Sequence, residues 1–111
     1  MRYVLNSAVI TSAGVYEYRL IKPDHVRHWL LCAPYTSTVG YAETAEALST
    51  LTGEAVPVDR KIIRMAPGDE ALVFRLVQPE GQRRLAPGAK GQVGQDYIRQ
   101  HCEAGILVRI A

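Results

Sequence analysis

The stretch Ala71-Leu72-Val73-Phe74-Arg75-Leu76-Val77 is the most apolar segment of the chain. Its apolar residues run almost without interruption, whereas a strand with one face in water alternates apolar and polar residues. A strand covered on both faces fits this pattern. The turn signal Pro67-Gly68-Asp69 comes directly before it. We therefore predict that residues 71–77 form the central strand of a sheet.

Further strands are predicted on both sides of this segment. Residues 3–5, 15–21, 56–65 and 106–110 are rich in β-branched and aromatic side chains, which favour strands. Gly14 lies between the first two of these segments and suits a hairpin. Residues 79–95 hold several prolines and glycines and are predicted as a loop.

Three helices are predicted between these strands. One opens at Pro23-Asp24 and stops at Pro34, because proline suits the first turn of a helix and cannot continue one. A second follows the polar stretch 36–41 and ends at Gly53, a residue that favours a helix C-cap. A third runs from about Asp96 to Glu103. The predicted fold class is thus α/β, with a single mixed β-sheet of about five or six strands flanked by about three helices.

Length and composition limit the classes of function. The 111 residues are one domain in size, predicted to span 1–111, and the formal charge of +2 is too small to indicate a duplex DNA-binding protein. No apolar run reaches the roughly 20 residues that span a bilayer. Cys32 and Cys102 fall in predicted helices and indicate no disulfide framework. We expect a cytoplasmic protein without membrane contact or cofactor. Ten of its thirteen basic residues are arginine, which suits bidentate phosphate recognition.

Several stretches, taken in order along the chain, resemble one known family. They are Leu5-Asn6-Ser7, residues 37–45 leading through Gly53 and Val56-Pro57-Val58 to Arg60, and residues 68–76 followed by Pro79-Glu80-Gly81. With the closing residues 104–109, this set resembles the viral ring nucleases, a type III anti-CRISPR family of archaeal viruses, phages and mobile elements.

The resemblance implies a homodimer whose cleft binds cyclic tetra-adenylate, a second messenger of host antiviral signalling. Family enzymes open this ring without a metal. A ribose 2′-hydroxyl attacks the phosphate, a histidine protonates the leaving oxygen, and an arginine stabilises the charged transition state. Carried onto this chain, the resemblance places ligand contacts at Asn6, Ser7, Thr38, Val39, Gly40, Tyr41, Arg60, Gln78 and Glu80.

The chain departs from the family pattern at two catalytic positions. Tyr41 stands where the family has its histidine, and a phenol is a poorer proton donor than imidazole near neutral pH. The arginine that usually precedes the Pro-Glu-Gly triplet is missing, because Gln78 leads directly to Pro79. We therefore expect binding without efficient cleavage. Two alternatives stay open: an active phosphodiesterase that uses a substitute acid, and a dimeric interaction module without a nucleotide ligand.

Other interpretations of single residues also stay open. Tyr41 could be an interface aromatic, Arg60 a surface charge, and Asn6-Ser7 a turn. His25, His28 and Cys32 share the i, i+3, i+7 face of the first predicted helix, and His101-Cys102 could complete a metal site. The alternative for these residues is solvated histidines with Cys32 as a small core residue.

Overall fold

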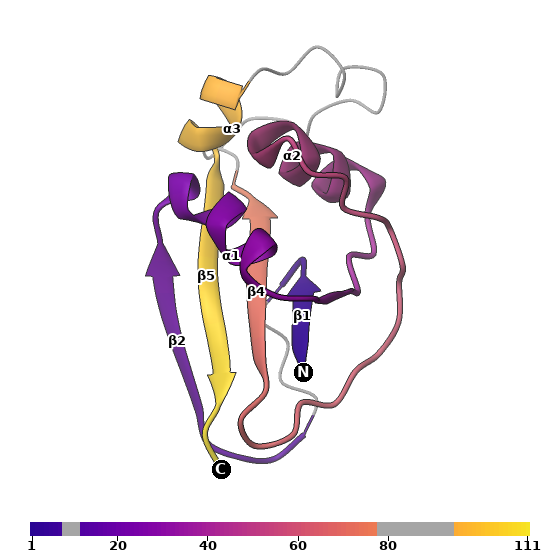
Figure 1. Cartoon of the computed structure of the whole chain (residues 1–111), viewed down its shortest axis with the longest axis vertical. Coiled ribbons are helices and arrows are strands. Elements are labelled where there is room, and N and C mark those ends of the chain that lie inside the picture. Colours follow the sequence, from indigo (N-terminus) through magenta and orange to yellow (C-terminus); the bar gives the residue numbers. More distant parts are fainter. Residues whose placement is uncertain (8–11, 78–94) are drawn as a thin grey trace.

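The structure, a computed structural model, describes residues 1–7, 12–77 and 95–111. Over these ranges the chain forms a five-stranded mixed sheet with three α-helices, which confirms the predicted α/β class (Figure 1). Residues 8–11 and 78–94 lie outside the described residues. The predicted contacts Gln78 and Glu80 and most of the predicted 79–95 loop fall in the second gap.

The five strands follow the order β2-β5-β4-β1-β3 across the sheet. Their bounds are Arg2–Leu5 for β1, Tyr16–Ile21 for β2, Thr36–Ser37 for β3, Glu70–Leu76 for β4 and Cys102–Arg109 for β5. β4 lies in the middle, parallel to β1 and antiparallel to β5. Its residues 71–74 are at most 1% exposed. The prediction of a central strand covered on both faces is confirmed.

The helices all cover one face of this sheet. They are α1 (Val26–Cys32), preceded by the 3-10 turn η1 (Pro23–His25), α2 (Ala42–Thr52) and α3 (Gln95–Gln100). Leu72 and Phe74 lie on the same face of β4, since side chains alternate along a strand. A single core cluster joins them to residues of all three helices, namely Val26, Leu30, Ala45, Ala47, Leu48, Leu51 and Ile98. Within the described residues, no helix is long and apolar enough to cross a membrane.

The segment between α2 and β4 covers part of the opposite face of the sheet. Ala71 and Val73 of β4 pack there with Tyr3, Leu5, Met65 and Leu107 in a second cluster, and Ile63 packs against it. Met65 and Ile63 come from the segment between α2 and β4, which passes around the β1 side of the sheet in Figure 1. This segment therefore carries residues 60–63 to the end of β1.

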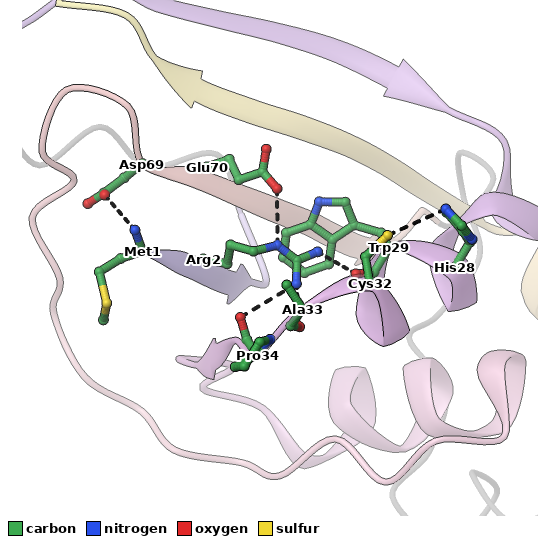
Figure 2. Close-up of polar contacts among 9 residues, drawn as sticks. All are labelled: Met1, Arg2, His28, Trp29, Cys32, Ala33, Pro34, Asp69 and Glu70. Atoms are coloured by element: carbon green, nitrogen blue, oxygen red, sulfur yellow. Dashed lines mark hydrogen bonds and ion pairs between the residues drawn. The ribbon is translucent and has the colours of Figure 1, made fainter.

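Arg2 fixes the position of β1 (Figure 2). Its guanidinium carbon lies 3.7 Å from the centroid of the Trp29 ring. The same group donates hydrogen bonds to the carbonyl oxygens of Trp29 and Ala33 and forms an ion pair with Glu70 at 3.1 Å. Because this arginine is mostly buried, its contacts lock β1 to β4 and to the end of α1. The strand that leads to Asn6 and Ser7 is thus anchored to its neighbours.

The prediction of a strand over residues 56–65 is wrong. These residues belong to no strand of the sheet. Pro57 has no N–H to donate, and the neighbouring contacts are isolated: Ser37 Oγ donates to the Pro57 carbonyl at 2.6 Å, and Asp59 N–H donates to the Val39 carbonyl at 3.0 Å. Extended residues without a continuous ladder keep a strand-like composition without forming a strand.

The predicted boundaries near the C-terminus are also wrong. α3 ends at Gln100 and β5 begins at Cys102, so Cys102 lies in a strand and not in a helix. Pairing with β4 holds residues 102–105 in extended form, and β2 also pairs with residues 104 and 105. This tertiary pairing overrides the local helical pattern. The predicted N-terminal hairpin is wrong for the same reason, because β2 pairs with β5 and not with β1.

Candidate functional site

A pocket of about 400 Å³ lies where β1 ends. Three segments form it: the residues after β1, the loop that leads into α2, and residues 60–63. The lining residues are Leu5, Asn6, Ser7, Thr38, Gly40, Tyr41, Arg60, Lys61, Ile62 and Ile63. Among the described residues, this lining contains two cations and no carboxylate. The composition favours an anionic ligand.

We define the inner wall of the pocket as Asn6, Ser7, Thr38 and Gly40. Hydrogen bonds join Thr38 to β1 and Gly40 to Asn6. The backbone N–H and the hydroxyl of Thr38 both donate to the carbonyl of Val4, at 2.9 and 3.0 Å. Gly40 N–H donates to Asn6 Oδ1 at 3.1 Å. The oxygen of the Asn6 amide is thereby used within the protein, and its NH₂ group provides the donors that a phosphate oxygen accepts.

The outer wall, which we define as Arg60, Lys61 and Ile62, is exposed. Just before these residues, the Pro57 and Asp59 contacts anchor its backbone to the 37–39 loop. The Arg60 stem crosses Gly40 closely: a Cβ at Gly40 would lie 3.2 Å from Arg60 Cγ and 3.3 Å from Cδ. The absence of a side chain at position 40 therefore lets Arg60 lie across the loop.

Tyr41 stands between the two walls, at the start of α2. The Arg60 guanidinium carbon lies 5.7 Å from its ring centroid, within the range of a cation–π contact. Tyr41 is the N-cap residue and makes no side-chain capping bond, and the first helical bond runs from Ala45 N–H to its carbonyl. The N–H groups of residues 42–44 thus have no partner within the helix, and they put a positive dipole end beside the pocket. Glu43 occupies the same first turn.

Six of the nine predicted contacts meet in this pocket: Asn6, Ser7, Thr38, Gly40, Tyr41 and Arg60. The Val39 side chain does not line it, because it is fully buried in the helix-side core. Sequence reasoning missed Leu5, Lys61, Ile62 and Ile63. A strand over 56–65 would send alternate side chains to opposite faces, so the wrong strand prediction concealed that four consecutive residues share one pocket.

The alternative metal site is not formed. His28 Nε2 lies 3.4 Å from Cys32 Sγ (Figure 2), but His101 Nδ1 hydrogen-bonds the Tyr97 carbonyl at 2.8 Å. Across residues 1–7, 12–77 and 95–111, no group of three His, Cys, Asp or Glu side chains is placed to hold a metal ion. Cys32 is exposed, so its interpretation as a core residue is wrong as well.

The fold and the pocket define a small mixed-sheet α/β protein with a cavity at the end of β1 that two cationic residues line. The chain belongs to the STIV B116-like family, whose model matches residues 2–88. The fold is also that of a solved structure, B116 of Sulfolobus turreted icosahedral virus. The two share a TM-score of 0.81 at 16% sequence identity, over 97% of this chain and 98% of the viral one.

Two further relatives come from a bacterium and from a virus. The protein YddF of Bacillus subtilis is 36% identical over 76 residues, which cover 67% of this chain and 70% of YddF. The protein ORF117 of Acidianus two-tailed virus is 29% identical over 91 residues, which cover 78% of this chain and 74% of ORF117. The expected relation to small viral proteins is confirmed at the level of this family.

Proposed function

We propose that the chain binds a cyclic oligonucleotide second messenger of the cyclic tetra-adenylate type and so counters host antiviral signalling. Binding sequesters the ring, with at most slow metal-independent cleavage. This would make the chain a ring-nuclease-like, anti-CRISPR protein.

The convergence of Asn6, Tyr41 and Arg60 in one pocket carries the proposal. These residues are far apart in the chain, and each supplies a different part of nucleotide recognition. Arg60 offers a bidentate cation to a phosphate, and Asn6 offers amide donors. Tyr41, with 46% of its surface exposed, offers an aromatic face to a base.

The size of the pocket supports a shared cleft. A volume of about 400 Å³ is near the lower end of the range for ligand pockets and suits one part of a ring, not the whole. Two copies of the chain related by a two-fold axis would present two such pockets to a symmetric ring. Exposed Tyr41 and Ile62 lie at the pocket and provide apolar surface for contact with the second copy.

Weak cleavage is supported by the lining residues. All three histidines of the chain are described, and none of them lines the pocket. Tyr41 therefore has no imidazole beside it to take over the role of the proton donor. Among the described residues, Tyr41 itself is thus the remaining candidate for a substitute acid.

The test is an equilibrium titration of the purified protein with cyclic tetra-adenylate, followed by sedimentation and by chromatography of the nucleotide. We expect one ring bound per two chains, a dimer at micromolar concentration, and intact ring after an hour. Many turnovers per minute without metal would instead establish an active phosphodiesterase. The absence of a binding signal from a folded dimer would support the interaction module.

A further inference from the structure

Lys61 is a basic residue at the pocket, and the family resemblance assigned it no role. Lys61 is one of the lining residues of the pocket and follows Arg60 directly in the chain. Its ammonium nitrogen lies 3.0 Å from Asp59 Oδ2, and both side chains are substantially exposed, 43% for Lys61 and 56% for Asp59. Asp59 itself is not part of the lining.

The Asp59–Lys61 ion pair is easily exchanged. Exposed pairs of this kind change an equilibrium by about fivefold at most, since water solvates both charges and two flexible side chains must be ordered. A phosphate within reach of Lys61 competes with Asp59 on nearly equal terms. The pair therefore holds the ammonium near the pocket at little cost to binding.

Asp59 is itself fixed at the backbone. Its N–H donates to the carbonyl of Val39, in the loop that leads to α2. The backbone of Asp59 is therefore anchored to this loop, which keeps its carboxylate near the pocket.

We propose that Lys61 is a second phosphate contact of the site and that Asp59 is a latch that releases it on binding. The inference rests on the proposed function and deepens it. Arg60 and Lys61 are adjacent cations, and a ligand with two or more linked phosphates engages both, whereas a single phosphate is held by Arg60 alone. The site therefore selects oligonucleotides over mononucleotides.

The test compares cyclic tetra-adenylate affinities of Lys61→Gln, Asp59→Asn and the double variant at several salt concentrations. Lys61→Gln should weaken binding about fivefold and lower the slope of log affinity against log salt by about 0.7 for each Lys61 that meets a phosphate. Asp59→Asn should strengthen binding by about two- to fivefold, because the competing carboxylate is gone. In the double variant the gain from Asp59→Asn should disappear.

Arg64→Gln is the matched control, since Arg64 is exposed in the same segment but does not line the pocket. It should leave both affinity and salt slope unchanged. Binding that is indifferent to Lys61→Gln overturns this inference while leaving the proposed function in place. A loss of affinity in Asp59→Asn overturns the latch. Failure of the unsubstituted protein to bind the ring overturns both proposals.

Discussion

The two walls of the pocket are built in different ways. The inner wall is part of the fold: Thr38 is 6% exposed and gives both its N–H and its hydroxyl to the carbonyl of Val4. The outer wall stands on the surface, with Ile62 87% exposed and Arg60 in contact with Gly40 and Tyr41. The contacts of the inner wall thus form as part of folding, whereas the outer-wall side chains contribute little to the stability of the fold.

This difference predicts that stability and ligand affinity depend on different residues. Substitutions in or behind the inner wall should lower the free energy of unfolding, because they remove buried contacts. Substitutions in the outer wall should lower ligand affinity and leave the stability of the free protein nearly unchanged. Tyr41 lies where the walls meet, and its substitution should change the rate of ring cleavage more than a substitution in either wall.

The largest effect on the rate of ring cleavage is expected at Tyr41. Restoring an imidazole by Tyr41→His should raise the rate of ring cleavage by at least about tenfold, since general-acid help is worth about 10²–10⁴-fold and the missing arginine limits the gain. Chromatography of cyclic tetra-adenylate and its linear products measures the rate. Tyr41→Phe is the control and should bring no gain. Equal rates in both variants would contradict a role of position 41 in proton donation.

The next effect is expected behind the inner wall. Val39 is fully buried in the core, and Val39→Ala removes two methyl groups there. The loss of burial and the small cavity should lower the free energy of unfolding by about 2 kcal/mol. Urea denaturation measures it. A tenfold loss of ligand affinity with unchanged stability would instead place Val39 at the ligand.

A smaller effect is expected at Thr38. Thr38→Val keeps the shape and deletes the buried hydroxyl that donates to the Val4 carbonyl. That carbonyl retains the backbone N–H, so the cost in unfolding free energy should be about 1 kcal/mol. Calorimetry of the free protein measures this change. An unaltered melting temperature would show that the inner wall does not depend on this bond.

The smallest effect is expected at Ile62, in the outer wall. Ile62→Ser changes a side chain that is 87% exposed, so unfolding free energy should stay within about 0.5 kcal/mol. Ligand affinity should fall on the order of threefold, because only part of the side chain would be covered by ligand. Parallel denaturation and titration curves check both values. A loss of stability above 1 kcal/mol, on the order expected of a buried contact, would contradict the independence of this wall.

The inner wall could be predicted from the sequence better than the outer wall. The family resemblance assigned Asn6, Thr38 and Gly40 to the site, and the pocket brings these three residues together. The path of residues 56–66 is set by separate contacts, such as Ser37 to Pro57, which local patterns do not encode. Arg60 was assigned through the same family resemblance. Lys61 was missed because neighbouring residues of a strand do not share a face.

Contacts between distant residues also explain why other predicted secondary-structure boundaries were wrong. β4 was predicted correctly because its burial on both faces is visible in its own composition. The start of β5 at Cys102 depends on pairing with Leu76 of β4, and the register of that pairing is a tertiary property. Local pattern therefore succeeds where an element is stabilised by its own residues and fails where distant partners decide.

The central claim is that Arg60 is a ligand contact and not a structural residue. The most direct measurement compares melting temperatures of Arg60→Ala and Arg64→Ala with and without cyclic tetra-adenylate. Both free proteins should melt within about 2 °C of the unsubstituted chain. Only Arg60→Ala should lose the ligand-induced shift, with an affinity lower by about 10–150-fold, as expected for a hydrogen-bonded charge worth about 1.5–3 kcal/mol. An unchanged shift in Arg60→Ala, or collapse of its free form, would contradict the account.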